Sequence, residues 1–192
     1  MNKGMNYLWP TKLLYESIED KCLLDNVVQE IFSTYDMDNP PSDYNNGLFD
    51  NCGPAMLQFK EKVVIPTFEK YLKEAHNSKL ADYKEYNFKS WITGTGNGYS
   101  MVYHNHSGAA FSAVFYLLAE DIRSGGDIVF SDPRHNANRG YAGALTKEFE
   151  NVFHTPNTGD IVVFPSFLYH YVNPYYSNLR IAMPVDLFLY YD

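Results

Sequence analysis

The sequence predicts an α+β protein in which helices come first and antiparallel strands follow. Two observations support this prediction. Apolar residues recur with a helical period in the first part of the chain, and short runs rich in β-branched and aromatic residues fill the second half. Because no helices alternate with these runs, the expected architecture is a jelly roll or a related barrel of antiparallel strands.

Two helices are expected within the first 80 residues. In residues 16–35, ESIEDKCLLDNVVQEIFSTY, the apolar side chains follow a helical period and indicate one buried face. A second helix is expected from about Ala55 to Ala75, with a break or bend at Pro66. Between them, residues 36–54 are rich in Pro, Gly and Asn and are expected to form a loop.

Short runs with strand composition, bounded by turn residues, follow one another after residue 85. These expected strands cover residues 86–96, 98–106, 111–120, 126–132, 159–166, 169–174 and 179–191. The sequence Ser-Gly-Gly-Asp at 124–127 predicts a hairpin turn. Residues 133–158 show no clear strand pattern, so this segment and residues 36–54 are candidate lids over a site.

Composition narrows the class of protein. The chain has 192 residues, which suits one domain, and it has no apolar run long enough for a membrane-spanning helix. The N-terminal segment lacks the apolar core of a secretory signal, so a cytoplasmic location is expected. Cys22 and Cys52 do not make a disulfide framework. A net charge of −8 argues against general nucleic-acid binding.

The clearest chemical signal is a set of histidines at strand ends. His104 and His106 lie two residues apart at the end of a predicted strand, so both side chains are expected on one face. They are either ligands of one metal ion or hydrogen-bonded surface histidines. His170 stands near the end of another predicted strand. Arg180 begins the last one, where a guanidinium buried in an apolar run needs an anion. That anion is either an internal carboxylate or the carboxylate of a bound cosubstrate.

These segments resemble the 2-oxoglutarate/Fe(II)-dependent oxygenases, and more narrowly a group that carries H-x-H, S-G-V-Y-Y, D-P-R and F-P-S-x-x-x-H in that order. The matching segments are HNH (104–106), SAVFYL (112–117), GGDIVFSDPR (125–134) and GDIVVFPSFLYH (159–170), followed by Arg180. The resemblance covers about residues 90–190. It implies a single domain over residues 1–192. Its core over 85–192 would be a cupin-like double-stranded β-helix, and residues 1–80 would provide mainly helical support.

The resemblance also implies cofactors and roles. Fe(II) would be bound by His104, His106 and His170, and the distal carboxylate of 2-oxoglutarate would pair with Arg180 and Tyr116. The implied enzyme is a dioxygenase that uses O2 and 2-oxoglutarate as cosubstrates. It would hydroxylate a prime substrate, which the sequence does not identify, and release succinate and CO2.

Position 106 departs from the wider superfamily, which has Asp or Glu there as part of a two-histidine, one-carboxylate triad. Three arrangements are open. His106 is itself the third ligand, which its spacing from His104 favours; or a nearby carboxylate such as Asp132 completes the triad; or the metal has two protein ligands only. Two alternative functions also stand: a cupin-like dioxygenase that binds its substrate directly without 2-oxoglutarate, and a non-catalytic jelly-roll binding module.

Overall fold

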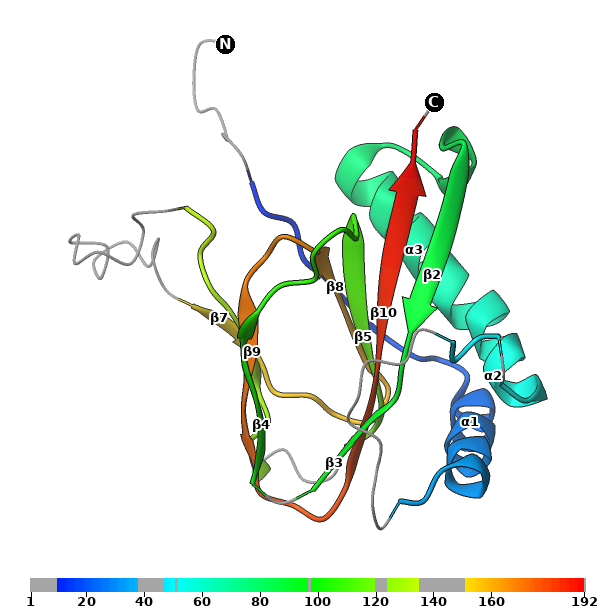
Figure 1. Cartoon of the computed structure of the whole chain (residues 1–192), viewed down its shortest axis with the longest axis vertical. Helices are drawn as coiled ribbons and strands as arrows, with labels where there is room; N and C mark the ends of the chain where they lie inside the picture. Colours follow the sequence, from blue (N-terminus) through cyan, green and yellow to red (C-terminus); the bar gives the residue numbers. More distant parts are fainter. Residues whose placement is uncertain are drawn as a thin grey trace, which may run out of the picture.

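The computed structural model describes residues 10–37, 47–50, 52–96, 98–119, 124–134 and 151–191. Two antiparallel sheets pack face to face, and the helices cover the outer face of the larger one (Figure 1). In the larger sheet the order is β1 (Leu14–Ser17), β8 (Asp160–Pro165), β5 (Phe111–Leu118), β10 (Arg180–Tyr190) and β2 (Glu85–Ser90), and β3 (Thr93–Thr95) also pairs with β10. In the smaller sheet the order is β4 (Tyr99–His104), β9 (His170–Tyr175), β6 (Ile128–Phe130) and β7 (Val152–His154).

The first predicted helix is confirmed as α1 (Lys21–Thr34). It begins where the side chain of Asp20 accepts a hydrogen bond of 2.9 Å from the backbone N–H of Leu23, because a carboxylate oxygen satisfies one of the free amides at a helix start. Its apolar face is buried, as the periodicity predicted; the buried residues are Leu23, Leu24, Val27 and Ile31.

The second predicted helix is also present, and it is helical throughout residues 54–76. It consists of α2 (Pro54–Phe59), a π-helical stretch η1 (Lys60–Val64), α3 (Ile65–Tyr71) and a second π-helical stretch η2 (Leu72–His76). The expected irregularity at Pro66 takes the form of the π-helical stretch just before it. Proline has no N–H and its ring excludes the usual hydrogen bond to the carbonyl one turn earlier, which a wider turn accommodates. A short 3₁₀ turn, η3 (Leu80–Asp82), leads into β2.

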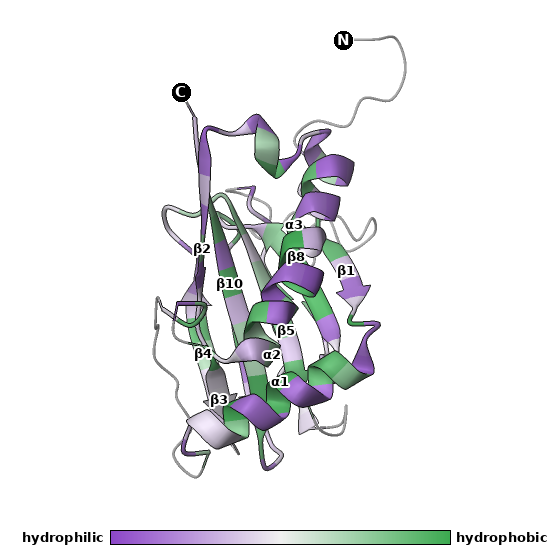
Figure 2. Cartoon of the chain, turned by 90° about the vertical axis from the view of Figure 1, so that its right-hand side faces the viewer, coloured by the Kyte–Doolittle hydropathy of each residue, from purple (hydrophilic) through white to green (hydrophobic). Residues whose placement is uncertain are grey.

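The central strands of the larger sheet are buried on both faces, because the helices pack on one face (Figure 2) and the smaller sheet packs on the other (Figure 1). Alternate residues therefore belong to different clusters. In β5, Ala113, Phe115 and Leu117 face the helices, whereas Val114 and Tyr116 lie between the sheets. The same alternation in β10 sends its odd-numbered core residues toward the helices and leaves its even-numbered residues to line the space between the sheets.

Three details differ from the prediction. β1 lies where the first helix was expected to begin, and β7 lies inside the 133–158 segment that showed no strand pattern. Both strands are too short for alternation to be legible. The predicted hairpin at 124–127 is wrong, because the flanking strands β5 and β6 belong to different sheets. Most of both candidate lids, including His135 in the 133–158 segment, lies outside the described residues.

No helix among the described residues is both long and apolar enough to cross a membrane.

Candidate metal centre

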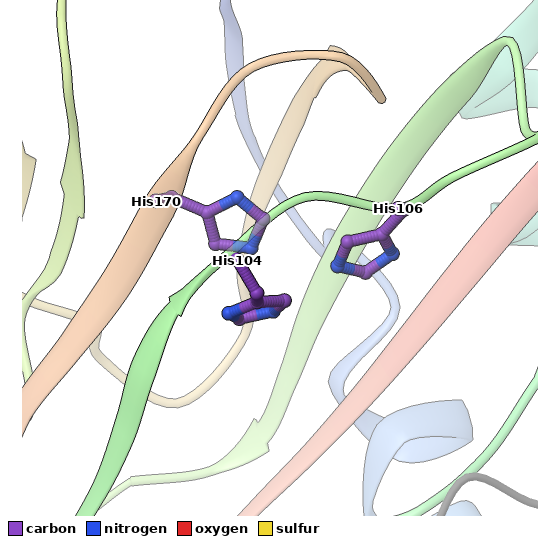
Figure 3. Close-up of side chains that lie close together, drawn as sticks. All are labelled: His104, His106 and His170. Carbon is purple, nitrogen blue, oxygen red and sulfur yellow. The ribbon is translucent and has the colours of Figure 1, made fainter.

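Three histidines from two parts of the chain, His104 and His106 from one and His170 from the other, meet at one end of the smaller sheet (Figure 3). His104 ends β4 and His170 begins β9, and the two residues pair directly in the β4–β9 register. Their ring centroids are 4.3 Å apart, and the ring of His106 lies 5.4 Å from His104 and 5.2 Å from His170. One nitrogen from each ring lies within 4.8 Å of the other two.

His106 reaches this cluster by a different route from the one its spacing suggested. β4 ends at His104, so His106 lies beyond the strand. Its backbone N–H donates a 3.0 Å hydrogen bond to the carbonyl of Ser166, which follows β8. Its ring is held between Trp91 and Phe164, with centroids 5.8 and 6.0 Å away. Contacts with the larger sheet and its connections therefore place this side chain.

Two of the three rings are oriented by main-chain carbonyls. Nδ1 of His104 donates to the carbonyl of Val102 at 2.7 Å, and Nδ1 of His170 donates to the carbonyl of Leu168 at 3.0 Å. A carbonyl oxygen only accepts, so the proton of each neutral ring is on Nδ1 and the lone pair is on Nε2. Both rings therefore present a metal-binding nitrogen.

The third ring, that of His106, is oriented by a carboxylate that the sequence analysis did not identify. Nδ1 of His106 lies 2.6 Å from Oδ1 of Asp186, which also accepts a 2.7 Å hydrogen bond from the hydroxyl of Ser112. Asp186 is buried on the inner face of β10. The sequence did contain an indication of this role, because Asp186 is an acidic residue in an otherwise apolar strand. It stands six positions after Arg180 and therefore on the same face of that strand.

Burial favours the neutral form of His104 and His170. It lowers the pKa of His170 to about 3, and the neighbouring rings of His104 and His106 act in the same direction. Burial also lowers the pKa of His104. Neutral imidazoles are ligands that suit iron and other transition metals, so the donor chemistry of this cluster fits Fe(II).

Asp132 is not a member of this cluster. Its carboxylate accepts hydrogen bonds from the backbone and the side chain of Arg134, and that side-chain bond holds the pKa of Asp132 below its usual range. The structure therefore gives Asp132 a turn-stabilising contact and brings only the three histidines together among the described residues.

Arg180 and Tyr116 line the same pocket as the three histidines. Arg180 is only 3 % exposed, and its Nη1 donates a 2.8 Å hydrogen bond to the carbonyl of Gly126. Within the described part of the chain its Nε has no hydrogen-bond partner. The same holds for the buried hydroxyl of Thr95, which is opposite Arg180 in the β3–β10 register. Of these two buried donors without acceptors, Arg180 lines the pocket and Thr95 is its paired neighbour, so an anion is the expected ligand at this end of the pocket.

Tyr116 lies in the strand next to Arg180, paired with Ala182. It is almost fully buried, and this burial raises the pKa of its phenol, so the hydroxyl keeps its proton and can donate. The other pocket walls are mainly apolar and include Val114, Ile128, Val172, Ala182 and Pro184.

Comparison with known families gives one match. The model of a family described as "Putative 2OG-Fe(II) oxygenase" matches residues 89–186, about half of the chain. A search of curated proteins found no match.

Solved structures with a similar fold include three prolyl hydroxylases. A prolyl-4-hydroxylase from Pseudomonas putida aligns with a TM-score of 0.62 and 17% identity, over 94% of this chain and 88% of that one. A prolyl hydroxylase from Trichoplax adhaerens, in complex with a hypoxia inducible factor peptide fragment, gives 0.60 and 16% identity, over 92% and 83%. A viral collagen prolyl hydroxylase from Paramecium bursaria Chlorella virus-1, in complex with 2OG, gives 0.54 and 17% identity, over 90% and 94%. At these identities the likeness establishes a related jelly-roll fold.

Proposed function

This chain belongs to the 2OG-Fe(II) oxygenase family and is therefore an oxidoreductase that depends on iron and 2-oxoglutarate; we propose that it hydroxylates a C–H bond of a prime substrate. In the balanced reaction, one oxygen atom of O2 enters the substrate and the other enters succinate, with release of CO2 from 2-oxoglutarate. The observation that carries the proposal is one pocket that holds three oriented histidines and a buried arginine with a free donor.

The proposed roles of the histidines follow from their tautomers. His104, His106 and His170 would bind Fe(II) through Nε2, because each Nδ1 is engaged with an acceptor on the opposite side of the ring. When bound, Fe(II) supplies the activation of O2. Hydrogen bonds to each Nδ1 orient the three rings, and the lowered pKa values of His104 and His170 leave these two rings free of competing protons at neutral pH.

The proposed cosubstrate site lies around Arg180. The distal carboxylate of 2-oxoglutarate would accept hydrogen bonds from Nε of Arg180 and from the hydroxyl of Thr95, which removes two unsatisfied buried donors at once. Tyr116 would donate a further hydrogen bond from the neighbouring strand. The apolar walls exclude water and strengthen these charged interactions.

We also propose that the two sheets form a double-stranded β-helix and that the helices and both sheets make up one catalytic domain. The paired buried clusters on the two faces of the larger sheet support this reading, because neither cluster is complete without that sheet.

The direct test is turnover of 2-oxoglutarate by protein loaded with Fe(II) in the absence of O2 and then exposed to O2. Succinate formation is expected from the unaltered chain, and it should fall to background in His170→Ala. Isothermal titration with 2-oxoglutarate adds a second measurement, because binding should require metal. Metal binding without metal-dependent 2-oxoglutarate binding would contradict the proposal and favour a dioxygenase that binds its substrate directly.

A further inference from the structure

We infer that Asp186 is a positioning residue for this metal centre. Its carboxylate would not bind the metal itself but would hydrogen-bond the far side of the His106 ring, so that one imidazole ring lies between the carboxylate and the ion. The inference rests on the proposed binding of metal by the three histidines. It concerns a residue outside that ligand set and explains how an all-histidine face keeps a nearby negative charge.

The three rings differ in the group that orients them. Val102 and Leu168 orient His104 and His170 through neutral carbonyl oxygens, each two residues before the histidine that it contacts. His106 has no such carbonyl contact among the described residues and instead meets Asp186, which is 80 positions away in the sequence. The ring at the position that departs from the usual carboxylate is thus the ring that has a carboxylate behind it.

Asp186 is buried in the interior of the protein, between the two sheets. The residue is 3% exposed, and among the described residues its carboxylate contacts the ring of His106 and the hydroxyl of Ser112, with no Lys or Arg in an ion pair. An ionised carboxylate is costly to bury without a compensating positive charge. A divalent ion on the far side of the His106 ring would provide that charge, and a hydrogen-bonded imidazole is the connection between them.

The carboxylate of Asp186 is itself held by hydrogen bonds. Ser112 is paired with Asp186 in the β5–β10 register, and its hydroxyl lies 2.7 Å from Asp186 and 2.7 Å from the hydroxyl of Ser166. The backbone carbonyl of Ser166 also accepts the backbone N–H of His106. One connected network therefore fixes the ring, the carboxylate and the loop that carries the ring.

The expected consequence is a tighter and more electron-rich metal site. A carboxylate that accepts a hydrogen bond from a ligating imidazole makes that imidazole a stronger donor, and loss of such partners typically costs about 10- to 100-fold in metal affinity. The negative charge also favours the ferric over the ferrous ion, so its removal should raise the reduction potential.

The test compares Asp186→Asn with Asp160→Asn. Asp160 pairs with His154 at 2.9 Å, so the control makes the same substitution in a histidine–carboxylate pair outside the cluster. Affinity for Co(II) and for anaerobic Fe(II) is measured by competition with a chromophoric chelator, and the Fe(III)/Fe(II) potential by redox titration. Asp186→Asn is expected to weaken binding at least about 10-fold and to raise the potential, with Asp160→Asn unchanged.

Equal affinity and potential in Asp186→Asn and the unaltered chain would overturn the inference while leaving the proposed function intact. Failure of the unaltered chain to bind metal would instead overturn the proposed function. If Asp186→Asn does not fold, Ser112→Ala removes the hydroxyl that orients the carboxylate. That variant should weaken metal binding in the same direction but by less, and no change in its affinity would also count against the inference.

Discussion

Arg180 and Thr95 are opposite each other in the β3–β10 register, and each has a buried donor atom without a partner among the described residues. Buried polar groups are nearly always hydrogen-bonded in folded proteins, so two such donors together indicate a place where a ligand completes the structure. The guanidinium is further held by its bond to the carbonyl of Gly126, so it does not need to reorganise when an anion binds.

Replacement of Arg180 by alanine should abolish useful binding of 2-oxoglutarate. Truncation of one partner of a buried charge pair costs about 2–5 kcal/mol, which corresponds to at least about 30-fold in Kd. Isothermal titration of the Mn(II)-loaded protein measures this directly. Arg134→Ala is the control, because that arginine is exposed and contacts Asp132. Similar 2-oxoglutarate affinities in Arg180→Ala and Arg134→Ala would show that the carboxylate binds elsewhere.

Replacement of Thr95 by valine should have effects of opposite sign on stability and on binding. Valine keeps the shape and the strand preference of threonine but lacks the hydroxyl. The ligand-free protein therefore loses an unsatisfied buried group, and its free energy of unfolding should rise by about 1 kcal/mol. Affinity for 2-oxoglutarate should fall about fivefold, since one hydrogen bond is worth about 1 kcal/mol. Thermal unfolding with and without 2-oxoglutarate measures both effects. A variant with unchanged affinity would remove Thr95 from the site.

Acid should destabilise the metal-free protein through His170. Its pKa is about 3 in the folded chain and about 6.5 when unfolded. Between these values the unfolded chain binds a proton that the folded chain does not, so the free energy of unfolding falls as pH falls. The slope from this residue is up to about 1.4 kcal/mol per pH unit inside that window. Urea unfolding at pH 7, 6 and 5 should show a shallower dependence in His170→Gln, and equal slopes would contradict the assignment.

The helices should contribute strongly to the stability of the larger sheet, which carries Arg180 and Tyr116. Phe59 is fully buried, with its ring packed edge-on against Phe115 of β5 at a centroid distance of 5.7 Å. Phe59→Ala should lower the free energy of unfolding by about 3–5 kcal/mol. Phe32→Ala removes an exposed ring from α1 and should change it by less than about 0.5 kcal/mol. Equal effects of the two variants would mean that the helix layer is not packed as described.

Much of the fold was predictable because its signals are local. The buried face of α1 follows from apolar spacing, and the strands β5, β8 and β10 follow from runs of β-branched and aromatic residues. The pairing of β5 with β8 and β10 was not predictable, because pairing partners depend on contacts between distant segments. The expected hairpin at 124–127 failed for this reason, since turn residues fix a local reversal but not which sheet receives the next strand.

In the candidate site, too, the residues with local sequence signals were predicted and those defined by distant contacts were not. The predicted set of three histidines, Arg180 and Tyr116 lines one pocket. Asp186 was overlooked because its importance comes from a partner 80 residues away, and Thr95 because a threonine in a strand has an ordinary structural explanation. The sequence pattern therefore located the residues that motifs contain, whereas the residues that orient or supplement them required the three-dimensional contacts.

The route by which His106 is held has a mechanical consequence. His104 and His170 belong to the smaller sheet, whereas His106 is bonded through Asp186 to β10 of the larger one. An ion shared by all three rings would cross-link the two sheets at this end of the pocket. Amide hydrogens of β4 and β9 near the histidines should therefore exchange with solvent more slowly in metal-loaded protein, so that cofactor occupancy also governs how freely the two walls separate.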